Sequence, residues 1–200
     1  MSNLEEKTAV FWYGSNHPEQ LSIRLNLDLE YVLNNCTACT LNGYRRAYEG
    51  YSETWDGKSV ATVIQDENAQ IDAFAFHMTP DQVLMMNKFE GYPNIYYREE
   101  VQLVDKLGIY FSAQVYIINS TGIFNYPTHE YLDANSLTLM AYHYLPPINR
   151  EVDFDYNKIT YPIYNGVTGE KVDDYMWGGI HYDFITSQYM ENSLKLDAQI

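Results

Sequence analysis

The sequence predicts an α+β fold built on a curled, mostly antiparallel sheet. From Cys36 to about residue 119, short apolar segments alternate with polar or glycine-containing turns, which is typical of strands. Only a few segments have the helical period, and each of them stands alone. Because strands and helices do not alternate as repeating βαβ units, the pattern indicates a mixed α+β domain.

The first predicted element is a strand at residues 9–14, AVFWYG. It stops at a short polar loop that begins with Ser15. Pro18 and Glu19 then predict the start of a helix, since proline is tolerated in a first turn and an acid there suits the helix dipole. A structural turn would explain the abrupt stop, and so would a loop that holds a small ligand with its backbone amides.

The segment after this start is ambiguous. Its leucines alternate from Leu21 to Leu29 as they would in a strand, but Leu21 and Leu25 also share a helix face. We expect a helix to about Asn26 and irregular chain after it.

Strands dominate the next part of the chain, with two helices among them. Thr79 is a plausible N-cap with Pro80 at the first helical position, and Gly91 ends that helix. A second helix is predicted at residues 127–144. The predicted strands span residues 39–51, 58–66, 70–78, 96–105 and 109–119.

From about Pro146 the chain becomes tyrosine-rich and irregular, so we expect a domain at residues 1–146 and an extension at residues 147–200. The extension is either a packing layer or a lid over a ligand pocket. Packing is favoured because several of its side chains are too apolar to be left in water together. These are Ile163, Val167, Met176, Trp177, Ile180 and Phe184. The tail at residues 188–200 is expected to be a short surface helix or frayed chain.

Charge and hydropathy narrow the class of protein. The 200 residues include 27 Asp and Glu against 12 Lys and Arg, a formal net charge of −15. Nucleic-acid binding depends on neutralising phosphates with basic side chains, so this balance argues against such a partner. The absence of a run of about eighteen apolar residues argues against a membrane span. The N-terminal MSNLEEKTAV does not resemble a signal peptide, so we expect a cytoplasmic protein.

Cys36 and Cys39 form a C-x-x-C pair, but no second pair or matching histidine spacing accompanies them. In a strand, residues three apart point to opposite faces, so the two thiols would diverge. We expect two reduced thiols and no metal site.

Glu90 stands at the predicted C-terminus of a helix, between Phe89 and Gly91. A helix C-terminus disfavours a carboxylate, and apolar neighbours disfavour it further. Both effects would raise the pKa of Glu90 towards the range that is useful for proton transfer. Local sequence alone still favours a solvated cap residue, because perturbed acids are a minority of all acids.

Two stretches resemble the signatures of one known family. FWYGSN, residues 11–16, resembles the YGSN loop of the γ-glutamylcyclotransferase-like, or AIG2-like, superfamily. MNKFEGYPNIYYREEVQL, residues 86–103, resembles its second signature, a helix that ends in Glu-Gly before a tyrosine-containing strand. The segments between them lie in the expected order, and the likeness covers roughly residues 8–145.

The resemblance implies a small barrel of mostly antiparallel strands with a few flanking helices. It also implies an enzyme that cleaves a γ-glutamyl amide by attack of the substrate's own α-amine, giving 5-oxoproline and a free amine or amino acid. The implied partner is this small γ-glutamyl substrate, and no cofactor is implied. Matched residue by residue, Tyr13, Gly14, Ser15 and Asn16 form the ligand loop, Glu90 is the catalytic acid and base, and Tyr97 lines the pocket.

The residue types suit this chemistry. A carboxylate with a raised pKa can take a proton from the α-ammonium and then pass it to the departing nitrogen. Backbone amides in the Gly14–Ser15 loop can stabilise the oxyanion of the intermediate, or hold the substrate's α-carboxylate.

Three features depart from the family pattern. His17-Pro18 follows YGSN where leucine is common, Asn87-Lys88-Phe89 replaces a more acidic run, and the extension has no counterpart. The enzyme remains the first hypothesis. His17-Pro18 and the unplaced extension motivate an alternative function, a protein that binds or sequesters a small molecule in the same pocket without turnover.

Overall fold

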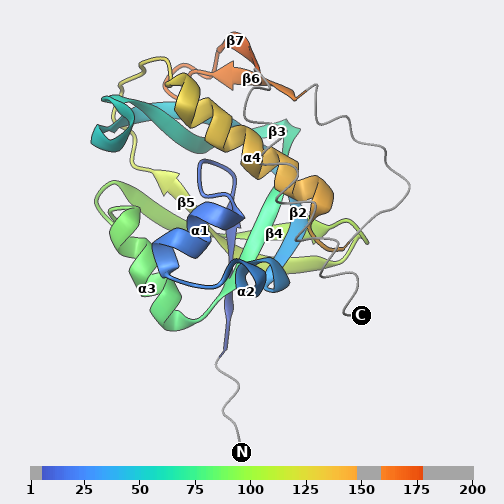
Figure 1. The fold of residues 1–200 in the computed structure, drawn as a ribbon. Helices are drawn as coiled ribbons and strands as arrows, with labels where there is room; N and C mark the ends of the chain where they lie inside the picture. The colour runs from blue at the N-terminus through green and yellow to red at the C-terminus, as the bar shows by residue number, and fades with distance from the viewer. Residues whose placement is uncertain (1–5, 148–158, 178–200) are drawn as a thin grey trace, which may run out of the picture.

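The computed structural model describes residues 6–147 and 159–177, and its centre is a closed five-stranded barrel in the order β1-β3-β2-β4-β5 (Figure 1). The barrel strands are β1 (Thr8–Trp12), β2 (Cys36–Ser52), β3 (Lys58–Met78), β4 (Tyr96–Asp105) and β5 (Tyr110–Ile118). The helices are α1 (Pro18–Leu25), α2 (Leu29–Asn34), α3 (Pro80–Phe89) and α4 (His129–Tyr144), with a 3₁₀ turn, η1 (Glu53–Trp55). The predicted α+β class and the barrel of mostly antiparallel strands are confirmed.

The barrel closes through a short parallel seam. β1 pairs antiparallel with β3 on one side, and on the other it pairs in parallel with β5 through Val10↔Gln114 and Phe11↔Val115. The remaining neighbours are antiparallel. β1 therefore lies between two strands, and its C-terminal end delivers the following loop to one end of the barrel.

β3 is one long strand, whereas the sequence predicted separate strands at residues 58–66 and 70–78. The polar residues between them form a bulge rather than a turn: the pairing with β2 shifts register between Asn42 and Tyr44. Gly43 has a φ of +80°, which glycine adopts at little cost. The side chain of Arg45 forms an ion pair with Asp66 across this irregularity.

The three predicted helices are present as α1, α3 and α4, and α2 is an additional one. Thr79 and Gln82 form a reciprocal capping box on α3, and Thr128 caps α4. The chain expected to be irregular after Asn26 instead forms α2, so that expectation is wrong. Asp28 starts this helix by accepting a hydrogen bond from the Glu30 amide at 2.9 Å.

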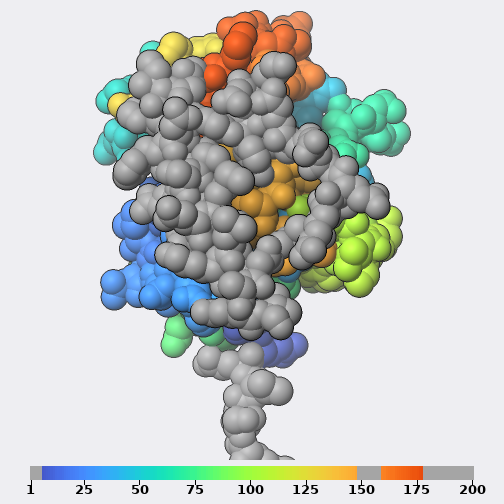
Figure 2. All heavy atoms as spheres, turned by 45° about the vertical axis from the view of Figure 1, so that its right-hand side comes forward, coloured from blue at the N-terminus to red at the C-terminus, as the bar shows by residue number. Residues whose placement is uncertain are grey.

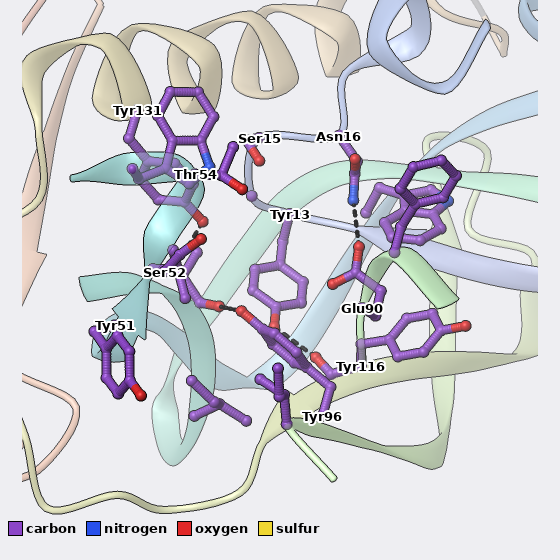
Figure 3. A pocket seen from close by; sticks show the side chains of 18 of the residues that line it. Tyr13, Ser15, Asn16, Tyr51, Ser52, Thr54, Glu90, Tyr96, Tyr116 and Tyr131 are labelled. Carbon is purple, nitrogen blue, oxygen red and sulfur yellow. Dashed lines mark hydrogen bonds between the residues drawn. The ribbon is translucent and has the colours of Figure 1, made fainter. Parts of the chain in front are cut away.

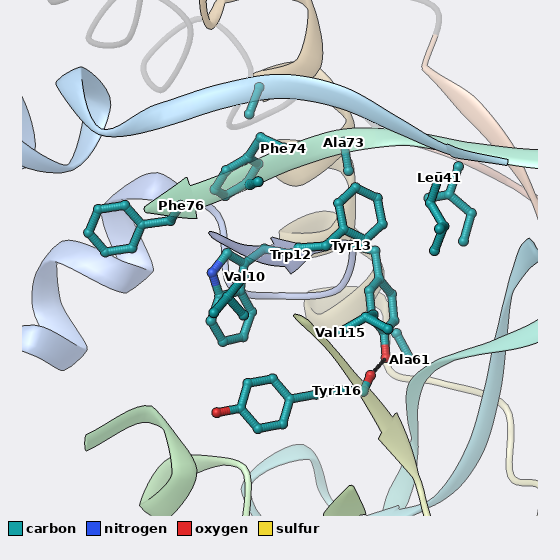
Figure 4. Packing of buried hydrophobic residues seen from close by; sticks show 14 of the residues in the cluster. Val10, Trp12, Tyr13, Leu41, Ala61, Ala73, Phe74, Phe76, Val115 and Tyr116 are labelled. Carbon is teal, nitrogen blue, oxygen red and sulfur yellow. Dashed lines mark hydrogen bonds between the residues drawn. The ribbon is translucent and has the colours of Figure 1, made fainter. Parts of the chain in front are cut away.

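Large apolar side chains fill the barrel, and those from β1, β3 and β5 meet at its centre (Figure 4). Trp12 stacks on Tyr116 with ring centroids 5.6 Å apart. Cys36 and Cys39 are buried free thiols, and burial is the main cause that raises the pKa of each. None of the helices in residues 6–147 and 159–177 is long and apolar enough to cross a membrane.

The described part of the extension forms a hairpin, β6 (Thr160–Tyr164) and β7 (Lys171–Met176), where irregular chain was expected. It lies at one end of the molecule beside α4 (Figure 1 and Figure 2). The Tyr161 hydroxyl donates to the carbonyl of Leu132, and the Tyr175 hydroxyl to Asp133, both on α4.

Burial in the hairpin follows the expectation only in part. Ile163 and Trp177 are buried, whereas Val167 and Met176 are exposed. The backbone of Gly166 donates to the carbonyl of Tyr48 on β2 at 2.8 Å. Ile180, Phe184 and the predicted tail helix lie outside the described residues.

Candidate functional site

A cavity of about 490 Å³ opens beside the C-terminal end of β1. Its lining comes from the loop after β1, α1, the end of α3, and the turn that joins β2 to β3. Figure 3 shows Glu90 on one side of this cavity, with Tyr51, Ser52 and Thr54 on the other. Segments that are distant in the sequence therefore form a single site.

The predicted ligand loop, Tyr13 to Asn16, lines the cavity along its whole length. The Tyr13 hydroxyl donates to the carbonyl of Tyr116, and Thr138 on α4 donates to the carbonyl of Gly14, each at 2.5 Å. These two bonds fix the loop against β5 and α4.

Gly14 approaches its neighbours closely. A Cβ at this position would lie 3.3 Å from the Ala61 side chain and 3.4 Å from the Tyr131 hydroxyl. The approach to Ala61 is tighter than most contacts of a Cβ atom, so a side chain here would require the loop or Ala61 to shift slightly. The glycine lets the loop lie against the barrel wall.

The carboxylate of Glu90 meets the loop. Asn16 Nδ2 donates to Glu90 Oε1 at 2.9 Å, and Arg24 Nη1 lies 3.5 Å from the same oxygen (Figure 3). The Glu90 side chain is only 12% exposed, so Glu90 is not the solvated cap residue that local sequence favoured. Its position at the C-terminal cap of α3 points it into the cavity.

Burial dominates the electrostatics of Glu90. It raises the pKa of the carboxyl above its ordinary value, and the charge of Arg24 and the Asn16 hydrogen bond oppose it in that order. A carboxyl that is held between these influences is suited to both accept and return a proton.

The expectation that Tyr97 lines the pocket is not met. Tyr97 is absent from the lining and is 39% exposed, whereas its neighbour Tyr96 is buried and lines the cavity. Successive side chains in a strand point to opposite faces, so only one of the two can face inward. The Tyr96 hydroxyl donates to the Ala61 carbonyl at 3.0 Å, which fixes its ring at the cavity wall.

The sequence interpretation missed several lining residues. Tyr131 on α4 accepts a hydrogen bond from the Ala61 amide at 2.7 Å, and burial raises its pKa, so its hydroxyl stays protonated. Arg24 lies in the last turn of α1, the helix that directly follows the ligand loop, and this proximity was the available signal. Residues 51–55 form the opposite wall, and no local pattern marks them.

The residues that depart from the family pattern have ordinary structural places. His17 is the N-cap residue of α1, with Pro18 at the first helical position. Burial, and then Arg24, lowers the pKa of His17 to about 4, so its ring is neutral at pH 7. Asn87 accepts a hydrogen bond from the Tyr116 hydroxyl at 2.6 Å, and Phe89 lines the cavity.

Metal-ligating side chains do not cluster in the described part of the chain: across residues 6–147 and 159–177, no three His, Cys, Asp or Glu side chains gather where they could hold an ion. At the cavity, Glu90 can transfer a proton, and its neighbours can donate or accept hydrogen bonds.

Comparison with known proteins gives one family and several similar structures. The family described as "Gamma-glutamyl cyclotransferase, AIG2-like" matches residues 10–147. No curated protein sequence matches the chain. A structure titled "Gamma-glutamyl cyclotransferase" is 15% identical with a TM-score of 0.55, covering 75% of this chain and 94% of its own.

Two other solved structures show the same fold at similarly low sequence identity. The uncharacterized protein loc79017 from Homo sapiens is 18% identical with a TM-score of 0.54, covering 76% of this chain and 94% of its own. YkqA from Bacillus subtilis is 15% identical with a TM-score of 0.58, covering 73% of this chain and 52% of its own. At these identities, the likeness is one of fold.

Proposed function

The chain belongs to the AIG2-like gamma-glutamyl cyclotransferase family, and from this premise we propose that it cleaves a γ-glutamyl amide by intramolecular cyclisation. The α-amine of the substrate attacks its own γ-carbonyl carbon. The products are 5-oxoproline and the released amine or amino acid.

One observation carries this proposal: the carboxyl of Glu90 lies in the same cavity as the Tyr13–Asn16 loop. Its Oε1 atom is 2.9 Å from Nδ2 of the Asn16 side chain. A substrate that is held by the loop has its reacting atoms within reach of a group that can transfer a proton. The two signatures therefore supply one site rather than two unrelated features.

The proposed reaction moves two protons. Glu90 takes the first from the α-ammonium, and the freed amine forms a bond to the γ-carbonyl carbon, whose oxygen becomes an oxyanion. The bond from that carbon to the leaving nitrogen then breaks as the carbonyl re-forms, and Glu90 returns its proton to the leaving nitrogen. The ring nitrogen gives its second hydrogen, as a proton, to the released amine, which departs as an ammonium. The substrate provides both nucleophile and electrophile, so the reaction as written uses no cofactor and no nucleophilic side chain.

The direct test is the formation of 5-oxoproline from a panel of γ-glutamyl amides. The panel contains γ-glutamyl amino acids, γ-glutamyl-ε-lysine and glutathione, and the product is quantified by mass spectrometry. Wild-type turnover of at least one compound, lost in Glu90→Gln, supports the proposal. Equal turnover by wild type and variant contradicts the proposed role of Glu90.

A second candidate function is binding without turnover, and the ion pair at Glu90 favours it. Arg24 and Asn16 both interact with the carboxylate and limit the rise that burial causes in the pKa of Glu90, which works against its protonated form. A protein that keeps Glu90 ionised would bind an ammonium group without releasing a leaving group. Native mass spectrometry of gently purified protein distinguishes the two, since a stoichiometric unmodified ligand favours sequestration.

We also propose that residues 1–146 form the catalytic domain and that residues 147–200 pack on it as an extension. The hydrogen bonds from Tyr161 and Tyr175 to α4 support this division for the described hairpin. No residue of the hairpin lines the cavity, so within residues 159–177 a packing role is better supported than a lid.

A further inference from the structure

The charges around the cavity are few and unequal. Among the described residues that line it, Arg24 is the only cation, while Glu53 and Glu90 are acids. The whole chain carries a formal net charge of −15, which disfavours the entry of an anion. Among the described lining residues, Arg24 is therefore the side chain with which the carboxylate of a ligand can form an ion pair.

Arg24 forms an ion pair with Glu90. Its Nη1 lies 3.5 Å from Glu90 Oε1, and the two side chains are 19% and 12% exposed. A distance of 3.5 Å is at the limit of a hydrogen bond, so most of the donor capacity of the guanidinium remains available. The guanidinium carbon lies over the Phe89 ring, 5.2 Å from its centroid, and this cation–π contact helps to position the guanidinium.

An α-amino acid carries its ammonium and carboxylate on one carbon atom. If Glu90 receives the proton of the α-amine, the α-carboxylate of the same substrate must lie within a few ångströms of Glu90. The structure has a guanidinium at that distance. Arg24 and Glu90 thus match the two opposite charges of the γ-glutamyl group, and a planar guanidinium can bind a carboxylate through two parallel hydrogen bonds.

We propose that Arg24 binds the α-carboxylate of the γ-glutamyl substrate beside Glu90. This inference rests on the proposed function and extends it. It also separates two binding roles: Arg24 binds the α-carboxylate, and the backbone amides of the Gly14–Ser15 loop are then available to stabilise the oxyanion. When the substrate neutralises Arg24, the carboxylate of Glu90 loses part of its stabilisation and becomes a stronger base.

The test combines a change in the enzyme with a change in the substrate. The best γ-glutamyl amide from the panel is compared with its 4-aminobutyryl counterpart, which lacks only the α-carboxylate and cyclises to 2-pyrrolidinone. Arg24→Gln should lower kcat/KM about 10- to 150-fold for the γ-glutamyl amide, as expected for a lost hydrogen bond to a charged group. For the counterpart, the loss should be less than about threefold, because the missing partner is already absent.

Two further variants separate binding from general effects. Arg24→Lys should recover part of the loss, since it restores the charge without the bidentate geometry. Lys88→Gln removes one exposed positive charge on α3, outside the cavity, and should leave the selectivity unchanged. Equal losses on both substrates in Arg24→Gln would show a structural role and overturn the proposal.

A binding measurement keeps this inference separate from the proposed function. Calorimetry compares 5-oxoproline, which has the carboxylate, with 2-pyrrolidinone, which lacks it, on full-length wild type and Arg24→Gln. The proposal requires that wild type prefers 5-oxoproline and that Arg24→Gln loses this preference, even in a protein that turns nothing over. A preference that persists in Arg24→Gln, or no preference in wild type, contradicts it.

Discussion

Asn16 and Glu90, 74 positions apart in the sequence, are joined by a hydrogen bond of 2.9 Å inside a cavity. The bond ties the loop after the first strand to the end of α3. Glu90 is oriented by a residue of the ligand loop, so a disturbance of either side affects both.

Glu90→Gln should lower the rate of 5-oxoproline formation about 10²- to 10⁴-fold, because the amide has nearly the same size but cannot transfer the proton. The measurement is kcat on the best substrate of the panel. Glu100→Gln is the matched control, since Glu100 is exposed on β4 and does not line the cavity. It should retain wild-type activity.

Glu90→Gln should also be more stable than wild type at neutral pH. Burial raises the pKa of Glu90 in the folded protein above its unfolded value. Stability gained from the protonated form is present below the unfolded pKa and is lost as the pH rises through the folded pKa. Glutamine is uncharged throughout, so the Tm advantage of Glu90→Gln should be present near neutral pH and should shrink towards about pH 4. A Tm advantage that grows on acidification contradicts this account.

Tyr96→Phe and Tyr97→Phe form a pair that tests which tyrosine serves the cavity. Tyr96→Phe removes a buried hydrogen bond to Ala61, which should cost about 0.5–1.5 kcal/mol and lower Tm by roughly 1–6 °C. It should also lower kcat/KM, because Tyr96 lines the cavity. Tyr97→Phe should change neither quantity. A loss of activity confined to Tyr97→Phe would restore the original assignment.

His17 should make the protein sensitive to acid. Its pKa falls from 6.5 to about 4 on folding because the ring is buried, with Arg24 adding to the effect. Unfolded chains take up a proton below about pH 6.5, while the folded protein does so only near 4, so stability falls over this window. The difference amounts to about 3 kcal/mol at the acid end. His17→Asn should lose this part of the pH dependence in denaturation curves measured from pH 7 to 4, and an unchanged slope contradicts it.

Trp177→Ala should destabilise the protein without changing its substrate preference. Trp177 is buried, and replacing such a side chain by alanine costs about 3–5 kcal/mol, or roughly 6–20 °C in Tm. Met176→Ala is the control, because the neighbouring Met176 side chain is 71% exposed. Measured KM values should not change in either variant, since the hairpin does not line the cavity. A shift in amine preference at constant Tm would favour the lid.

Element types were predictable from local sequence where a single signal dominated. Thr79 followed by Pro80 marked the start of α3, and the alternation in residues 96–105 marked β4. α2 was missed because its six residues, Leu29–Asn34, are too few to show a helical period, and Asp28 was the overlooked cap. β3 was divided in two because a bulge and a turn use the same polar residues in sequence.

The candidate site was predictable only where the family signatures carry it, in the loop and at Glu90. Arg24, Tyr116 and Tyr131 come from α1, β5 and α4, and only the closed barrel brings them together. Tyr97 was chosen over Tyr96 because spacing alone does not tell which of two adjacent strand residues faces inward. A shift of one residue in a strand exchanges its two faces.

The parallel seam between β1 and β5 has a consequence for how the molecule is made. During synthesis, β1 emerges before the other barrel strands. One edge of β1 stays unpaired until Gln114 and Val115 of β5 have been made and can pair with Val10 and Phe11. Until then, an apolar strand carrying Trp12 has an open edge that can pair with other chains. The ligand loop directly follows this strand, and β5 contributes residues to the lining of the cavity, so a nascent chain has no complete pocket before β5 has paired. A complete pocket and protection from aggregation should therefore appear together, at the moment when β1 and β5 pair.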